Sequence, residues 1–542
     1  MGGGELQLAI SGSSVQDFIL TGNPQITFYK MVYKKYSNFS MESITQDFNG
    51  GSIKQSQGTT LFCTLERSGD LVSEIYFCFE LPEIYSGKYS EDNSEPYYNY
   101  EFQWIKNIGV NIIDSVNIKI GSQIIDEQFG EWMQIWNELN LNESEKKNYY
   151  EMIGNVPELY SPGNARGQNG LYPHITSGNT STLQSNKYND YFTKIITIND
   201  ASENITFPSI KSRKIKVPLT FWFNKNKGLA LPLISLQNAE VKIEIKLRPI
   251  EDLYTVIETK SSSSNFKKRV KTNRDTHNTI ENFIIDSDFV NVSGTTRSLK
   301  TFDIKPFLEV NYVFLNNDER KKFALTEHKY LITQVSRLQI EGVSSDVTED
   351  LEFNQSSKYL VWVGRRNDTL DRNDWNNYTN WLYEEVPPYS NEYSHLTGYG
   401  TNFVGSSLPF YNESDSNHKL YFKPSYLQKQ ILKTTEIQFN GNVRLREKDS
   451  LYYKTQIFNY FKTNNKNDGI HVYSFSINPK EFQPSGNCNF SKIDTLSFKF
   501  EINDIPLDSS NNLLYKYDFN IYSVNYNIFR VMNGVGGLQF AS

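Results

Sequence analysis

Short stretches in which every second residue is hydrophobic recur along the chain, and they constrain its fold more than any other feature. They include Ile75–Leu81, Val116–Ile120, Leu308–Phe314 and Leu496–Ile502. Successive side chains of a β-strand point to opposite faces of a sheet, so each stretch is typical of a strand that buries one face. Between Val241 and Leu247 the alternate residues are charged, as in an antiparallel sheet with one face in water. The pattern predicts an all-β protein of packed antiparallel sheets.

Length and composition predict more than one folded domain. The chain has 542 residues, which is more than a single hydrophobic core usually serves, so two or three domains are expected. Aromatic residues make up 14% and charged residues 22% of the chain. This balance favours packed β-structure over disorder.

The charge of the chain argues against a nucleic-acid-binding role. The formal net charge is -7, whereas binding to phosphates depends largely on positive charge and counterion release. The densest basic run follows a serine-rich segment and comprises Lys267, Lys268, Arg269, Lys271 and Arg274. With only Phe266 nearby to stack on a base, this run is interpreted as a solvated loop. No direct contact with nucleic acid is expected.

The three cysteines and the amino terminus point to a reducing compartment. Cys63, Cys78 and Cys488 form neither a CxxC pair nor an even disulfide framework, so they are expected to be buried thiols. The first residues lack a basic region followed by an apolar core, and Leu6 stands where a myristoylation signal needs Ser or Thr. No apolar stretch approaches the roughly 20 residues needed to cross a bilayer, so membrane contact is expected to be indirect.

The usual sequence signals of catalysis are missing. The six histidines are scattered without an HExxH pair, and no Walker, GxGxxG or GxSxG motif occurs. We therefore assign no catalytic, cofactor-binding or metal-binding residue and expect no enzyme activity. Two alternatives stay open: Glu384 and Glu385 could belong to a glycosidase pair, and the aromatic segment Asp374–Tyr399 could bind sugar or protein or pack on itself.

Three helices are expected among the strands. Asn23 and Pro24 are a good N-cap and first-turn pair for a helix through Tyr33. Helical spacing after Gly130 involves Trp132, Ile135, Trp136 and Leu139, and Asp318 is expected to cap a helix that runs to His328. A domain boundary is predicted near Arg248–Leu253, where regular strands give way to polar sequence that continues to about Lys300.

The segment Tyr473–Asp494, YSFSINPKEFQPSGNCNFSKID, carries turn chemistry between two strands. It closely resembles the segment that marks the major capsid proteins of nucleocytoplasmic large DNA viruses, a family that includes mimivirus, phycodnavirus and iridovirus members. Further resemblances follow in family order at Asp17–Gly50, Val116–Leu139, Val217–Ile250, Glu309–Val335 and Tyr522–Phe540. The similarity therefore extends from end to end.

This resemblance implies a double jelly roll, two consecutive eight-stranded jelly-roll β-sandwiches with few short helices and long surface loops. Combined with the boundary above, it predicts four parts: an amino-terminal arm (1–22), a first jelly roll (23–250), a polar linker or insertion (251–300) and a second jelly roll (301–542). Residues 1–22 are expected to lie under the shell or to reach a neighbour. The long loop Arg365–Gly405 is expected on the exterior of the virion.

The resemblance also implies a structural, non-enzymatic role. Family members form homotrimers that serve as pseudo-hexagonal capsomers and tile an icosahedral shell. The implied partners are further copies of the chain and minor capsid and penton proteins, with an inner membrane contacted indirectly. The implied location is the virion capsid, assembled in the viral factory of the host cytoplasm. The alternatives are a lectin-like carbohydrate-binding jelly roll and a sandwich-fold glycoside hydrolase.

Overall fold

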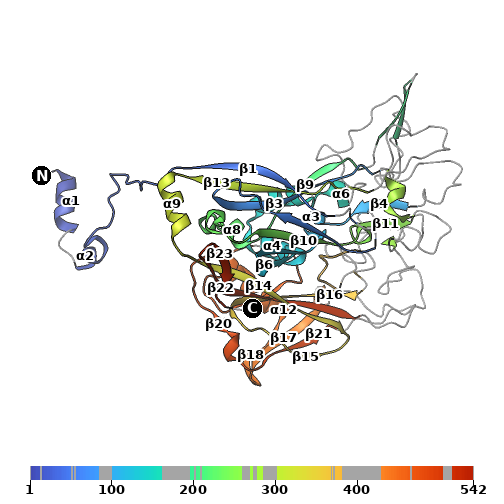
Figure 1. Ribbon diagram of the computed structural model, residues 1–542. Helices are drawn as coiled ribbons and strands as arrows, with labels where there is room; N and C mark the ends of the chain where they lie inside the picture. The colour runs from blue at the N-terminus through green and yellow to red at the C-terminus, as the bar shows by residue number, and fades with distance from the viewer. Residues whose placement is uncertain are drawn as a thin grey trace.

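Two β-sandwiches lie one above the other, with short helices between and around them (Figure 1). The computed structural model describes residues 2–11, 15–50, 53, 56–84, 100–160, 196–200, 203–207, 210–258, 269–270, 272, 278–284, 302–367, 369, 373–380, 429–463, 467–503 and 516–540. Each sandwich is made of two four-stranded antiparallel sheets, with small strands added at the edges.

The first sandwich is formed by residues 39–315. In spatial order, its outer sheet comprises β1 (Phe39–Asp47), β13 (Phe307–Leu315), β3 (Leu71–Leu81) and β9 (Arg213–Pro218). Its inner sheet comprises β2 (Thr59–Thr64), β10 (Val241–Leu247), β5 (Ile113–Ile120) and β6 (Gln123–Phe129). The strands Ile75–Leu81, Val116–Ile120 and Val241–Leu247 therefore lie where their alternation predicts.

The second sandwich is formed by residues 328–538. Its inner sheet comprises β14 (His328–Val343), β22 (Tyr517–Met532), β16 (Ser356–Arg366) and β19 (His471–Ser474), extended by β20 (Cys488–Asn489) and β23 (Val535–Leu538). Its outer sheet comprises β15 (Val347–Asp350), β21 (Leu496–Ile502), β17 (Leu432–Phe439) and β18 (Asn442–Asp449).

The two sandwiches have the same topology. When the eight main strands of each are numbered in chain order, one sheet has the order 1-8-3-6 and the other 2-7-4-5. This interleaving of early and late strands is the strand connectivity of a jelly roll. The predicted all-β double jelly roll is confirmed.

The observed pairing moves the boundary between the rolls. The predicted division placed residues 307–315 in the second roll, after a linker at 251–300. In the structure β13 lies between β1 and β3, with Val310 opposite both Ile44 and Ile75. Residues 251–300 are thus an insertion between the seventh and eighth strands of the first roll. A polar stretch can be an insertion within one roll as readily as a linker between two rolls, and composition alone does not distinguish an insertion from a linker.

Smaller elements complete the fold. A three-stranded sheet comprises β4 (Tyr100–Trp104), β11 (Tyr254–Glu258) and β12 (Arg269–Val270), and β7 (Ile196–Asp200) pairs with β8 (Glu203–Phe207). Short helices are α3 (Ile108–Asn111), α5 (Glu143–Ile153), α6 (Pro157–Tyr160), α8 (Trp222–Lys225) and α12 (Ser450–Phe461). Single 3-10 turns occur at Lys227–Leu229, Leu233–Ser235, Ile250–Asp252, Ile280–Phe283 and Phe490–Lys492.

The three helix predictions have different outcomes. Helix α4 (Gly130–Asn140) is confirmed. Helix α9 (Asn317–Leu325) is also present, but its cap is Asn316, whose side chain accepts a hydrogen bond from the Glu319 amide at 2.9 Å. The helix expected from Asn23 to Tyr33 is wrong. Asn23 has a left-handed φ of 53°, and the helices of this region, α1 (Gly3–Ser11) and α2 (Val15–Thr21), precede it.

The core of the second roll is built around Trp362 on β16, which is fully buried. Its ring contacts Tyr453 at 4.8 Å and Phe498 at 5.3 Å, both edge to face, and lies nearly parallel to His471 at 5.9 Å. Such aromatic clusters contribute large buried area and favourable ring geometry.

His471 makes this core sensitive to acid. Burial, together with the positive charge of the nearby Lys454, lowers the pKa of His471 from 6.5 to about 4. The folded state therefore holds this ring neutral. The free energy of unfolding has its full value above pH 6.5 and falls as the pH decreases toward 4. Between pH 7 and pH 5 we expect a loss of about 2 kcal/mol in the free energy of unfolding that His471→Phe does not show. Urea titrations of both proteins at the two pH values measure this difference, and equal losses would contradict it.

Candidate functional site, the interface between the two rolls

The interface between the rolls is a hydrophobic layer of its own. The inner sheet of the first roll and helix α4 face the inner sheet of the second roll (Figure 1). Its buried residues form one cluster: Phe129, Trp132, Ile135, Leu139, Val335, Tyr359, Val361, Val363, Tyr378, Ile457, Phe461, Ile470, Val472, Tyr522 and Val524. Burial of this apolar surface holds the two rolls in one orientation.

Strand β16 contributes one face to the interface and the other face to the core of the second roll. Leu360 and Trp362 point into the second roll, whereas Val361 and Val363 point into the interface. The strand is therefore buried on both faces, although it belongs to an antiparallel sheet. Its sequence YLVWV at 359–363 is accordingly continuous in apolar residues rather than alternating.

Glycine at position 130 lets β6 turn directly into α4. A Cβ atom at Gly130 would collide with the backbone carbonyl oxygens of Ile113 and Val110. The close approach sets helix α4 against the second roll, so that Trp132 contacts Tyr522 with ring centroids 5.1 Å apart. The first residue after this glycine is Glu131, whose side chain enters the interface.

Glu131 is the polar centre of the interface. Its carboxylate accepts hydrogen bonds from the Tyr522 hydroxyl at 2.5 Å and from the Asn520 side-chain amide. Arg365 lies 3.5 Å away, and both charged side chains are almost completely buried. A buried carboxylate is tolerated when it is paired and hydrogen-bonded. Three residues of the second roll thus bind one carboxylate of the first.

A second polar contact ties the segment after β16 to the first roll. The Asn376 side-chain oxygen accepts hydrogen bonds from Asn107 at 3.0 Å and Asn111 at 2.7 Å. Asn373 donates to the backbone oxygens of Glu251 and Tyr254 at 2.6 and 2.8 Å. These bonds add directional contacts to the apolar layer.

The aromatic segment Asp374–Tyr399 is described only as far as Asn380. Within that part Tyr378 is 1% exposed and belongs to the interface cluster, and the Trp375 indole donates to the Asp252 carbonyl at 3.0 Å. These two rings pack against other parts of the protein, Tyr378 in the interface cluster and Trp375 against the 3-10 turn at Ile250–Asp252, rather than on the segment itself. The rest of the segment, including Glu384 and Glu385, lies outside the described residues.

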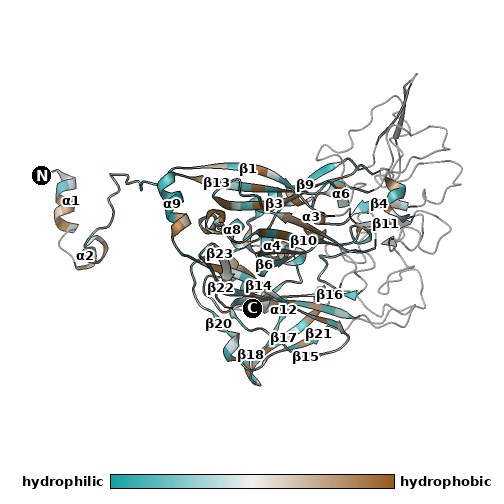
Figure 2. Ribbon diagram, viewed as in Figure 1, coloured by the Kyte–Doolittle hydropathy of each residue, from teal (hydrophilic) through white to brown (hydrophobic). Residues whose placement is uncertain are grey.

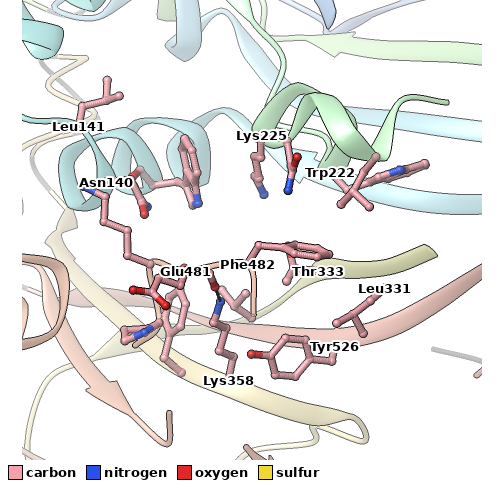
Figure 3. A pocket seen from close by; sticks show the side chains of 17 residues that line it. Asn140, Leu141, Trp222, Lys225, Leu331, Thr333, Lys358, Glu481, Phe482 and Tyr526 are labelled. Carbon is pink, nitrogen blue, oxygen red and sulfur yellow. Dashed lines mark hydrogen bonds between the residues drawn. The ribbon is translucent and has the colours of Figure 1, made fainter. Parts of the chain in front are cut away.

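A cavity of about 320 Å³ opens beside the apolar layer (Figure 3). Helices α4 and α8 of the first roll form one wall, with Trp136, Asn140 and Lys225. Strands β14, β16 and β22 form the opposite wall. The segment Pro479–Phe482, part of the motif noted in the sequence, closes the side.

Two lysines point into this cavity from opposite walls, Lys225 from the first roll and Lys358 from the second (Figure 3). The ammonium group of Lys358 donates to the Glu481 carbonyl oxygen at 2.8 Å. Burial, together with the positive charge of Lys225, lowers the pKa of Lys358 to about 8. Burial also lowers the pKa of Lys225 to about 8, against the attraction of Asp126.

The other residues singled out from the sequence form no site in the described part of the chain. Of the basic run, Arg269 lies in β12, and its four lysine and arginine companions fall outside the described residues. Among the described residues no group of three His, Cys, Asp or Glu side chains could hold a metal ion. No helix in the described ranges is long and apolar enough to span a bilayer. Cys63 and Cys78 are buried as expected, and Cys488 is partly exposed.

A second candidate site is the amino-terminal arm, residues 2–38, which projects away from the rolls (Figure 1). Its hydrophobic side chains are between 52% and 100% exposed: Leu6, Leu8, Ile10, Val15, Phe18, Ile19, Leu20, Ile26, Phe28, Tyr29, Met31, Val32, Tyr33 and Tyr36. Figure 2 shows hydrophobic residues on α1 and α2 far from either core. A large exposed apolar segment is typical of a protein–protein contact.

Sequence reasoning did not identify Glu131, Arg365 or the cavity. Their positions depend on which sheets face each other, which no local pattern states. One signal could have located the interface: the continuous apolar run at 359–363 indicates a strand with both faces covered.

Comparison with known proteins agrees with the fold. Residues 27–316 match the family model "Major capsid protein N-terminus" and residues 319–537 match "Large eukaryotic DNA virus major capsid protein". The break between these matches falls just after β13. It thus coincides with the end of the first roll.

Relatives span the whole chain. The major capsid protein of Phaeocystis pouchetii virus is 29% identical and that of Chrysochromulina ericina virus 28%, each over 100% of both chains. The quasi-atomic model of the PBCV-1 virus capsid superimposes with a TM-score of 0.59 at 22% identity, covering 95% of this chain and 100% of that one. The chain therefore belongs to the major capsid proteins of large eukaryotic DNA viruses.

Proposed function

We propose that three copies of this chain form one pseudo-hexagonal capsomer, which then tiles the icosahedral shell. The observation that carries the proposal is the repeated topology: two rolls of identical strand order are fixed side by side in each chain. Three such chains present six similar rolls around one axis. Closed cyclic symmetry of this kind is the usual outcome of self-association.

The proposal has a direct test. The purified chain is expected to have three times the mass of 62.8 kDa by light scattering and a six-sided outline by electron microscopy. A stable monomer, or a dimer with a two-fold outline, would contradict it.

We propose that the arm binds a neighbouring copy of the chain rather than its own rolls. Its exposed apolar side chains and its projection from the body support this assignment. The predicted arm, residues 1–22, covers α1 and α2, and the chain continues without helix or strand to β1 at Phe39.

Deletion of residues 2–22 is expected to leave the trimer intact and to weaken the lattice between trimers, because none of the described residues of this segment belongs to the core of either roll. Light scattering measures the trimer, and electron microscopy of assembly reactions measures the lattice. The double variant Phe18→Ser and Leu20→Ser is the matched control, since it keeps the length of the arm and removes two exposed apolar groups. Loss of the trimer on deletion would place the arm inside the trimer instead.

We further propose minor capsid and penton proteins as partners, an inner membrane contacted only through other proteins, and assembly in the viral factory of the host cytoplasm. All three cysteines are free thiols, which suits a chain matured under reducing conditions. The net charge of -7 supports a shell that does not bind the genome directly. Of the predicted exterior loop Arg365–Gly405, Arg365 lies in β16 and Tyr378 is buried between the rolls, which corrects that part of the prediction. Residues 381–405, which lie outside the described residues, remain proposed for the exterior.

A further inference from the structure

The cavity between the rolls has the donors of an anion-binding site. The ammonium groups of Lys225 and Lys358 approach it from opposite walls, and the hydroxyl of Tyr526 points into it from β22 (Figure 3). All three are hydrogen-bond donors, and two carry positive charge. They come from three different elements, α8, β16 and β22.

These donors have few of the acceptors that buried donors usually have. The Tyr526 hydroxyl is buried and has no hydrogen-bond partner among the described residues. Among the described residues no ion pair joins Lys225 or Lys358 to a carboxylate, and the one hydrogen bond of Lys358 goes to a neutral carbonyl. The ammonium groups lie over aromatic rings instead, Lys225 over Trp136 at 5.2 Å and Lys358 over Tyr526 at 5.5 Å from the ring centroid. Lys358 is only 4% exposed. Buried cations without a counter-anion and a buried hydroxyl without an acceptor are costly, so a bound anion would stabilise them.

The charge of the surroundings favours an anion. The ionisable side chains that line the cavity are Lys225, Lys358, Lys480 and Glu481, together with Tyr359 and Tyr526. Three lysines and one glutamate leave an excess of two positive charges at neutral pH. Behind Lys225 lies Asp126, and burial raises the pKa of its carboxyl, which weakens its compensation of the charge of Lys225.

We propose that this cavity binds a small dianionic oxyanion of the phosphate class between Lys225, Lys358 and the Tyr526 hydroxyl. The anion would accept hydrogen bonds from both ammonium groups and from the hydroxyl. Because Lys225 belongs to the first roll and the other two to the second, the bound anion links the rolls. The Pro479–Phe482 segment then has a role: it closes the cavity and orients Lys358 through the Glu481 carbonyl.

The test is isothermal titration calorimetry of the purified full chain with inorganic phosphate at pH 7, with sodium chloride at matched ionic strength as the reference. Saturable binding of one phosphate per chain is expected. Calorimetry is needed because phosphate also stabilises proteins generally, by exclusion from their surface. Absence of saturable binding up to about 10 mM would overturn the proposal.

Three variants locate the site. Lys225→Met should weaken binding about tenfold or more, and Tyr526→Phe about two- to tenfold, as expected for losing a charged and a neutral donor. Lys499→Met, at an exposed position of β21 outside the cavity, should bind as the natural chain does. Unchanged binding in both cavity variants would overturn the assignment. If Lys225→Met does not fold, Tyr526→Phe still decides, since it removes a single oxygen atom.

A second titration with glycerol 3-phosphate identifies the source of the anion. Tighter binding of this monoester than of inorganic phosphate would show that the site takes the phosphate group of a larger molecule. Tighter binding of inorganic phosphate would show a free ion. Both results support the proposed chemistry, and binding of neither compound refutes it.

Discussion

Glu131→Ala is expected to lower the free energy of unfolding by about 3–5 kcal/mol, the cost of breaking a buried ion pair from one side. The substitution leaves Arg365 buried opposite no carboxylate, and it removes the acceptor of the Tyr522 hydroxyl and the Asn520 amide. All three of these partners belong to the second roll, so the loss should appear as weaker attachment between rolls. Urea titration followed by tryptophan fluorescence measures it, with Trp132 lying next to the site.

The matched control is Glu327→Ala. Glu327 also pairs with an arginine of the second roll, Arg530, but both side chains are substantially exposed. Exposed ion pairs contribute at most about 1 kcal/mol, so this variant should be nearly as stable as the natural chain. Equal losses in the two variants would mean that burial of the Glu131 pair has no special importance.

Trp362→Ala is expected to cost about 3–5 kcal/mol, because it removes the largest fully buried side chain of β16 and leaves a cavity. The neighbours Tyr453 and Phe498 lose their edge-to-face partner. Since the two strands that flank β16 in its sheet also carry interface residues, the damage should reach trimer assembly. Denaturation and light scattering of the same preparation test both effects.

The Trp362→Phe variant keeps an aromatic ring at this position and removes the indole nitrogen. That nitrogen has no hydrogen-bond partner among the described residues, so its removal leaves no acceptor unpaired. The phenylalanine variant should therefore lose much less stability than the alanine variant. A phenylalanine variant as unstable as the alanine one would show that cavity volume is not the main cost.

The periodicity of single strands was predictable because it is a local property. Alternation at Val241–Leu247 and helical spacing at 130–140 each depend only on residues near in sequence, and both elements are present. Resemblance of ordered sequence blocks then supplied the jelly-roll topology, which alternation alone does not determine. The helix predicted after Asn23 is absent because this segment packs on neither roll, and a short helix is rarely stable without such packing.

Contacts between distant segments were not predictable from local patterns. The sequence separation between Glu131 and its partners Asn520 and Tyr522 is 389 and 391 residues. The place of β13 in the first roll likewise depends on pairing with β1, at least 260 residues earlier. The same holds for the cavity, whose two lysines lie on different rolls.

The position of β13 determines when the first roll can fold during translation. The first roll cannot close until residue 315 has left the ribosome, because β13 fills the gap between β1 and β3. Until then those two strands expose unpaired edges, which in a nascent chain attract other strands. Once β13 is inserted, the first roll is complete before most of the second has been translated. A pause in translation shortly after this point would therefore favour correct folding, whereas a pause shortly before it would favour aggregation.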